Sequence, residues 1–404
     1  MDENSIAETP KLTETAGYRM RILSVLAISF VVLGHMNFTG DLSTTMQEPL
    51  TFGGWFPYYS FHMALFLFIS GYFFTDLPEG RKFLPGLFRF VGKKAWKFLL
   101  PYYVFTGLSL LFNGWLHSQG FSFGYSFTFF RWLLNPWITP YTVTFTVADW
   151  YLPALFLAEI YFVLLRALFR KLIRRSLPRE TALLAFTLAA GMAAVYWKET
   201  AALSGAAVVY LRSVVMLFFL QAGAVYRRHL EAHDTLKSCW YFPIVFAAQF
   251  LLILLSGNDS LTPGLFGLWN MGKTGAVFFI GGVTGILLWL RVSSLLAFLP
   301  WRSRLVTFIG KNTKTVMITH IFCWFLLNTL LFHLHKMNHN GILVSDFSRK
   351  WYHSFMYYCS IGNPRMILLY YLVGMGLPLL CCFIVQAVRR RITIRGGSLP
   401  DRMK

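Results

Sequence analysis

Three histidines interrupt long apolar stretches of the sequence, where an ionisable side chain is costly. His35 ends a stretch that begins at Arg21, His62 lies in the next such stretch, and His320 lies in one far along the chain. A neutral imidazole can take a proton from an attacking hydroxyl, or it can itself carry an acyl group. A buried histidine can equally be a hydrogen-bonding residue without chemistry. The choice depends on where the surrounding helices place the three rings.

Those helices are expected to cross a membrane. The chain has 404 residues, of which 56% are hydrophobic and 13% charged, a composition typical of a polytopic α-helical membrane protein. We expect an all-α domain over residues 19–390, between a polar tail (1–18) and a basic tail (391–404). No small-residue cleavage site ends the first apolar stretch, so we expect it to be retained. The ten expected spans are 20–38, 54–75, 97–116, 148–168, 181–197, 208–226, 240–256, 270–290, 305–329 and 365–388.

The basic residues indicate how these spans are oriented. The net charge is +20, and the positive charges recur in alternate short loops instead of gathering in one domain. This distribution is the positive-inside pattern of a protein in the plasma or inner membrane, with anionic lipid head groups as partners. We therefore expect no nucleic-acid partner, and we place both termini in the cytoplasm.

This topology assigns a depth to each histidine. The first and ninth spans run outward and the second runs inward, so His35, His62 and His320 all fall in the outer half of the bilayer. Agreement in depth across three helices favours a shared polar cavity. Arg21 and His35 are fourteen residues apart, which separates them by about 40° around a helix and roughly 21 Å along it. The two side chains therefore share one helix face that joins the inner surface to the cavity.

Other charged residues extend this picture. Glu159 falls near the middle of the fourth span and should be protonated or paired with a cation, for which Arg212 and Lys273 are the candidates. A structural ion pair and a catalytic or substrate-orienting role both remain open for it. Lys94 and Lys97 share a helix face at the start of the third span. They are either an ordinary positive-inside flank or a site for a cytoplasmic anion.

Five separated segments resemble the membrane-bound acyltransferase family 3, especially its fucose-4-O-acetylase-like branch. The segments are Val-Val-Leu-Gly-His35, Phe61-His-Met-Ala-Leu-Phe-Leu-Phe-Ile-Ser-Gly-Tyr72, Lys94-x-x-Lys97-Phe-Leu-Leu-Pro, Trp150-Tyr-Leu-Pro, and Ile309-Gly-Lys-Asn-Thr with the following Ile318-Thr-His320. The chain departs from the family pattern in having Ser24 where an arginine is common, so Arg21 is expected to substitute. It also has a lysine pair where two arginines are usual, which removes the bidentate contact to phosphate.

The resemblance implies transfer of an acyl group, usually acetyl, from cytoplasmic acetyl-CoA or another acyl-CoA to a sugar hydroxyl. The acceptor would be an envelope glycan, an extracellular polysaccharide or a lipid-linked saccharide. We expect His35 to be the general base, or the carrier of an acyl-histidine intermediate, assisted by His62, His320 and Glu159. Arg21, Lys94 and Lys97 would bind the donor phosphates. The residues expected to bind substrate are Asp149, Trp150, Arg212 and Lys273.

Two aromatic or histidine-rich segments and the cysteines carry weaker signals. Segment 117–147 is expected to lie along the outer interface, as an aromatic belt or as a sugar-stacking surface. Segment 330–364 contains His333, His335, His339 and His353, but no nearby cysteine or carboxylate pair supports a metal site. The five cysteines lack metal or redox spacing. Two other functions remain open at this stage: a transporter or flippase with a histidine–Glu159 proton relay, and a non-catalytic membrane component of polysaccharide assembly.

Overall fold

The computed structural model describes residues 12–36, 52, 54–122, 124–140, 144–257, 261–299, 302–337, 352–353 and 364–395. Across these residues the fold is helical, without a β-strand, as the sequence predicts. The helices are α1 (Glu14–His35), α3 (Tyr58–Tyr72), α4 (Phe83–Lys94), α5 (Leu100–Ser118), α6 (Phe129–Ile138), α7 (Tyr151–Leu172), α8 (Ser176–Thr200), α9 (Ala206–Val225), α10 (Ser238–Ser256), α11 (Ala276–Ala297), α12 (Arg304–Met337) and α14 (Pro364–Arg395). Two short non-α helices matter for the site: η3 (Ala95–Leu99) and η4 (Thr144–Trp150).

The described residues contain nine helices that are long and apolar enough to cross a membrane. The second of the ten predicted spans is the exception, because α3 has only 15 residues, or roughly 22 Å at 1.5 Å per residue. Twelve of those 15 residues are buried, so α3 lies inside the helix bundle and presents little surface to lipid. The eighth predicted span also starts later than expected, at Ala276, because residues 272–275 form turns in which two glycines have positive φ.

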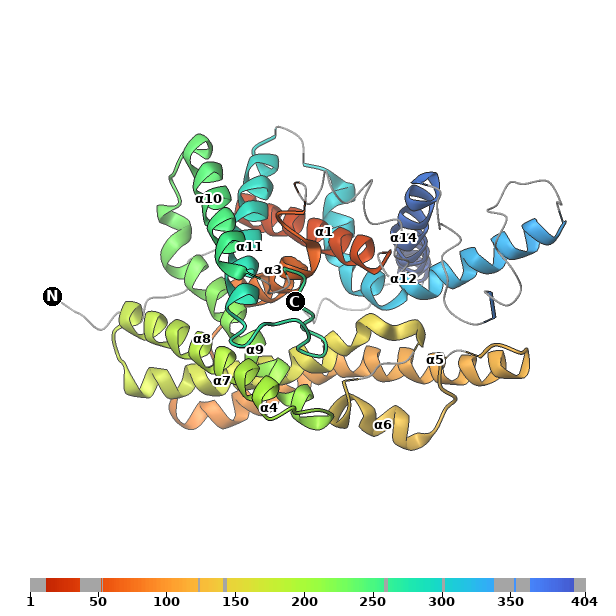
Figure 1. Ribbon diagram of the computed structural model, residues 1–404, viewed down its shortest axis with the longest axis horizontal. Coiled ribbons are helices and arrows are strands. Elements are labelled where there is room, and N and C mark those ends of the chain that lie inside the picture. Colours follow the sequence, from red (N-terminus) through yellow and green to blue (C-terminus); the bar gives the residue numbers. More distant parts are fainter. Residues whose placement is uncertain are drawn as a thin grey trace.

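The centre of the bundle is formed by α1 and α3. In Figure 1 these two helices lie in the middle of the molecule, with α12 and α14 to the right and α7, α8 and α9 to the lower left. The crossing of α3 and α9 is unusually close. A Cβ atom at Gly71 would lie 1.8 Å from the carbonyl oxygen of Leu220, and one at Gly223 would lie 2.0 Å from that of Phe68. Glycine at both positions therefore allows the two backbones to touch.

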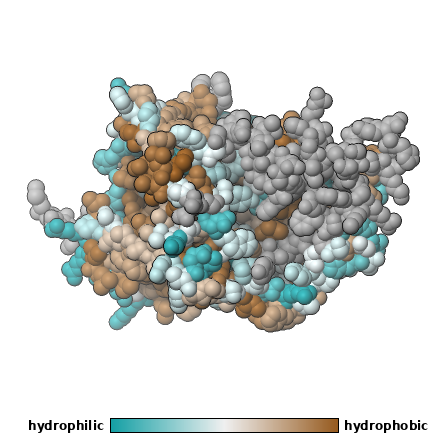
Figure 2. Space-filling model, in the orientation of Figure 1, coloured by the Kyte–Doolittle hydropathy of each residue, from teal (hydrophilic) through white to brown (hydrophobic). Residues whose placement is uncertain are grey.

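The outer helices expose apolar side chains, as lipid-facing helices do. On α10, Trp240, Ile244, Leu254 and Leu255 are all more than half exposed. Figure 2 shows apolar side chains gathered over the upper left of this face, where α10 lies in Figure 1. The apolar surface here is on the outside of the molecule, which supports a bilayer as its surroundings.

A buried ionic cluster that the sequence reasoning did not predict joins α7, α8 and the chain after α3. Arg166 donates to Asp76 at 2.6 Å and to Glu180 at 2.7 Å, and Arg228 contacts both carboxylates at 3.0 Å. Arg166 is only 2% exposed, so its charge depends on these two partners. The cluster fixes Asp76, which lines the first of the two cavities described below.

The two weaker segments are only partly described. In segment 117–147, α6 packs on α5 through hydrogen bonds from Trp132 Nε1 to the Tyr103 carbonyl (2.7 Å) and from Trp137 Nε1 to the Tyr103 hydroxyl (2.9 Å). In segment 330–364, His353 stacks on Phe121, while His339 and the side chain of His335 lie outside the described residues. Four of the five cysteines are described and free: Cys239, Cys323, Cys381 and Cys382.

Candidate active site

One face of α1 connects two cavities. Arg21 and Ser24, near the start of the helix, line the first cavity, whereas Val31 and His35, near its end, line the second. The spacing of three, seven and four residues keeps these side chains on one side of an α-helix. The predicted common face of Arg21 and His35 is therefore present, with a cavity at each end of it.

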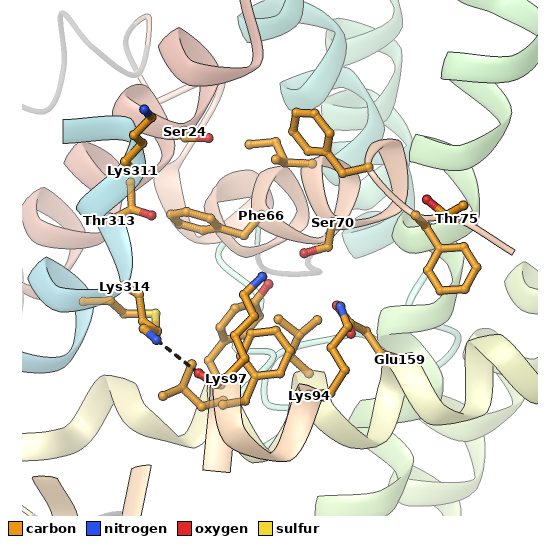
Figure 3. Close-up of a pocket in the computed structure, with 18 of the residues that line it drawn as sticks. Ser24, Phe66, Ser70, Thr75, Lys94, Lys97, Glu159, Lys311, Thr313 and Lys314 are labelled. Atoms are coloured by element: carbon orange, nitrogen blue, oxygen red, sulfur yellow. Dashed lines mark hydrogen bonds and ion pairs between the residues drawn. The ribbon is translucent and has the colours of Figure 1, made fainter. Parts of the chain in front are cut away.

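The first cavity, called here the basic cavity, has a volume of about 730 Å³ and contains five cationic side chains. Figure 3 shows Lys94 and Lys97 rising from one wall, Lys311 and Lys314 on a second wall, and Phe66 and Ser70 on a third. These walls come from α4 with η3, from α12, and from α3, respectively. Arg21 closes the set and donates to the Gly310 carbonyl at 3.4 Å. The concentration of positive charge makes the basic cavity suited to an anionic ligand.

The two acidic residues that line the basic cavity, Asp76 and Glu159, are both in ion pairs. Glu159, 3% exposed, forms an ion pair with Lys94. The sequence-based prediction that Arg212 or Lys273 pairs with Glu159 is therefore wrong. The partner is Lys94, whose side chain extends into the bundle from the end of α4. Within the described part of the chain, Lys97, Lys311 and Lys314 form no ion pair. These three ammonium groups, together with the Arg21 guanidinium, which also forms no ion pair among the described residues, are available to a bound anion.

The second cavity, called here the histidine cavity, has a volume of about 350 Å³. It is lined by His35 of α1 and His62 of α3, by Trp150 at the end of η4, and by the turn 262–270. His320 of α12 is fully buried directly behind His35, and the two rings are stacked with their centroids 5.0 Å apart. The structure thus brings together the three histidines that the sequence places at one depth.

The hydrogen bonds of the histidines determine their tautomers. His320 Nδ1 lies 2.9 Å from the carbonyl oxygens of Val316 and Met317, so it must carry a proton and donate. The Nε2 atom of neutral His320 is then an acceptor, and it lies 2.8 Å from His35 Nδ1. His35 therefore donates from Nδ1 and carries its lone pair on Nε2. A chain from backbone carbonyl to His320 to His35 orients the imidazole that faces the cavity.

A tight turn forms one wall of the histidine cavity. Gly264 and Trp269 exchange backbone hydrogen bonds of 2.7 and 3.0 Å, and Trp269 is half exposed. Buried Arg212 holds this turn by donating to the Phe266 carbonyl at 3.0 Å, with its guanidinium 5.0 Å from the centre of the Trp150 ring. Arg212 therefore positions the wall of the cavity, and its charge is used in the turn instead of being paired with Glu159.

The two cavities meet at α12. Met317 lines both of them, and its carbonyl accepts the hydrogen bond that orients His320. On the opposite side, Trp150 lines the histidine cavity and the next residue, Tyr151, lines the basic cavity. A cationic chamber and an imidazole-containing chamber therefore lie next to each other and share Met317 in their walls.

Comparison with protein-family models identifies the chain. The model of acyltransferase family 3, described as an acyltransferase domain, matches residues 19–387. The chain belongs to this acyltransferase family. No curated protein and no solved structure gives a match. The family match, together with the nine apolar helices among the described residues, makes the protein a multi-pass membrane acyltransferase and favours an enzyme over a transporter or a non-catalytic component.

The remaining predicted site residues of this acyltransferase are more scattered. Lys273 is exposed in the turn before α11 and touches neither cavity, so its placement within a span is wrong. Asp149 is fully buried beside Trp150 but lines neither cavity. Lys311 and Lys314 were not predicted as site residues, although the Gly-Lys-Asn-Thr-Lys run at the start of α12 contains both. Among the described residues, no three His, Cys, Asp or Glu side chains are grouped as metal ligands.

Proposed function

We propose that this acyltransferase moves an acyl group, normally acetyl, from a cytoplasmic acyl-CoA to a hydroxyl of an envelope or extracellular polysaccharide or its lipid-linked precursor. The observation that supports this most is the junction at Met317, where the basic cavity adjoins the histidine cavity. A donor with a phosphorylated head and a long thioester arm needs those two environments in that order. The fucose-4-O-acetylase-like segments favour a sugar hydroxyl as acceptor.

The donor would be held by lysines of the basic cavity. Lys97 and Lys311 have no carboxylate partner within the described chain and would contact the phosphates. A lysine binds phosphate as a point charge, so several lysines are needed where two arginines would suffice. Lys94 has a different role in this proposal: its ion pair keeps Glu159 neutralised inside the cavity. Arg21 supports the opposite wall through Gly310.

His35 would act as the general base from Nε2. It takes the proton of the acceptor hydroxyl while the oxygen attacks the thioester carbonyl; the new C–O bond forms, the C–S bond breaks, and His35 returns the proton to the departing sulfur. His320 accepts the hydrogen bond from His35 Nδ1 throughout and stabilises the positive charge on that ring. His62, which donates from Nδ1 to the Tyr58 carbonyl at 2.6 Å, presents a second Nε2 atom to the same cavity. A covalent acyl-histidine at His35 is the rival course of the reaction.

The acceptor would enter the histidine cavity beside the turn 262–270. Trp269 offers a half-exposed aromatic face and Asn270 an amide, a combination that suits the apolar face and the hydroxyls of a sugar ring. The cavity volume of about 350 Å³ is within the range of small-molecule sites. Arg212 would hold this wall in position.

The proposal is tested by following labelled acetyl groups. Membranes containing the wild-type protein, supplied with labelled acetyl-CoA and the cell's own envelope glycan, should transfer label to glycan. His35→Ala should abolish transfer at an unchanged protein level, whereas His233→Ala, at an exposed histidine of η6 (Glu231–His233), should not. Mass spectra of the glycan with and without the gene identify the acceptor and the acyl group. Wild-type transfer by His35→Ala, or glycan flux without label transfer, would refute the proposal.

A further inference from the structure

Helix α5 has two faces of opposite character. Its exposed face is apolar and contains Val104, Leu108, Leu111 and Trp115, as expected for contact with lipid. Its buried face contains Leu110 and Leu116 together with four polar side chains, Tyr102, Thr106, Ser109 and Asn113. The spacing of four, three and four residues places these polar groups in one row along the helix. Neutral polar side chains inside a membrane domain ordinarily form hydrogen bonds to neighbouring helices.

Half of this row lacks hydrogen-bond partners. Ser109 Oγ and both polar atoms of Asn113 have no partner in the described part of the chain, while the Thr106 hydroxyl contacts the Tyr102 hydroxyl of the same row. Thr106, Ser109 and Asn113 are 1%, 6% and 0% exposed, respectively. Buried polar atoms are nearly always paired, because leaving them unpaired costs free energy. The row is therefore built to contact something other than the protein's own side chains.

The element that faces the row is η4. Phe112 of α5 contacts Phe145 at the start of η4, with ring centroids 5.6 Å apart, and Tyr102 interacts electrostatically with Asp149 near its end. The two segments thus run antiparallel. Val147, Ala148 and Trp150 of η4 line the histidine cavity, and Asp149 does not. The Asp149 side chain is therefore directed away from that cavity, on the side of Tyr102 of α5.

Asp149 is the acidic residue of η4 at its interface with α5, called here the α5–η4 seam. The side chain is fully buried, and neither carboxylate oxygen has a partner among the described residues. Arg212 also interacts electrostatically with Tyr102, but it forms no ion pair with Asp149. Its guanidinium instead donates to the Phe266 carbonyl and lies over the Trp150 ring. The backbone of η4 is also irregular, since Thr146 has φ −121° and ψ 33°. Broken helices coordinate small cations within membranes through the carbonyl groups of their unwound backbone.

We propose that the α5–η4 seam binds one monovalent cation, Na⁺, through the carboxylate of Asp149 and the hydroxyls of Thr106 and Ser109. Asn113, one turn further along α5, lines the approach. The donors are all hard oxygen atoms, which favour a hard cation over zinc or copper, and a single carboxylate balances a single positive charge. The bound ion would fix η4 and with it the wall of the histidine cavity formed by Val147 and Trp150. This site is independent of the identity of the acyl donor or acceptor.

The test uses the purified full-length protein in detergent. We expect saturable binding of radioactive ²²Na⁺ and a melting temperature about 3–5 °C higher in NaCl than in choline chloride at equal ionic strength. Asp149→Asn should weaken ²²Na⁺ binding by about tenfold or more and remove the difference in melting temperature. Glu199→Gln, which removes a carboxylate from the exposed pair with Lys198, should keep both.

Two further results decide the proposal. If Asp149→Asn does not fold, Ser109→Ala and Thr106→Val provide the same comparison, and each should weaken ²²Na⁺ binding. The proposal is wrong if the wild-type protein binds no ²²Na⁺, if the variants bind it as tightly as the wild type does, or if Ca²⁺ binds in its place at lower concentration.

Discussion

Replacing His320 tests the orientation of the proposed base. His320→Leu removes the acceptor that lies 2.8 Å from His35 Nδ1 and leaves that N–H buried without its partner. A buried hydrogen bond lost from one side costs about 1–3 kcal/mol. The bond becomes charge-assisted when His35 takes a proton, and so roughly doubles in strength. Because the neutral bond is lost from the ground state as well, only this gain, about 1–3 kcal/mol, is lost from the transition state relative to the bound complex, which corresponds to a roughly 5- to 150-fold lower kcat.

The assay is transfer of labelled acetyl from acetyl-CoA to envelope glycan, with kcat and the donor KM measured separately. His320→Leu should lower kcat and leave the donor KM unchanged, because His320 lines neither cavity. His320→Gln places an amide oxygen near the position of Nε2 and should recover part of kcat. Full activity in His320→Leu, or an equal loss in both variants at unchanged folding, would show that His320 does not orient His35.

Four other substitutions test the donor site, the helix crossing and the acceptor wall. Lys97→Ala and Lys311→Ala should each raise the donor KM about tenfold, and the effect should shrink as salt increases; this is measured by initial rates at several ionic strengths. Gly71→Ala should destabilise the protein by about 3 kcal/mol or more, because its Cβ meets backbone at 1.8 Å, whereas Gly376→Ala, with open space around it, should melt as the wild type does. Trp269→Ala should raise the acceptor KM about 2- to 12-fold without changing the donor KM.

The sequence predicted the site best where helix geometry alone decides the outcome. Apolar length and basic loops indicated the helical membrane class, and spacing placed Arg21 and His35 on one face of α1. The common depth of His35, His62 and His320 followed from alternating span direction. Their meeting in one place is confirmed by the 2.8 Å contact between His35 and His320 and by the shared cavity of His35 and His62. The orientation of both termini remains a prediction.

The sequence failed where the outcome depends on contacts between distant helices. The sequence suggested Arg212 and Lys273 as partners of Glu159. The actual partner, Lys94, is brought to Glu159 by the packing of α4 and η3 against α7. The turn that engages Arg212 depends on positive φ values at Leu268 and Asn270, which periodicity does not reveal. The shortness of α3 has the same origin, since a helix enclosed by others need not match the thickness of a membrane.

In the proposed reaction, the thioester arm of the donor extends from the basic cavity past Met317 to reach His35 in the histidine cavity. The most direct measurement compares acetyl-CoA binding with acetyl transfer in Met317→Trp, using Met317→Leu as the control of similar volume. We expect Met317→Trp to bind acetyl-CoA with unchanged affinity but to transfer acetyl at least about 100-fold more slowly, while Met317→Leu does both normally. Transfer at the wild-type rate by a folded Met317→Trp would show that the donor does not pass Met317.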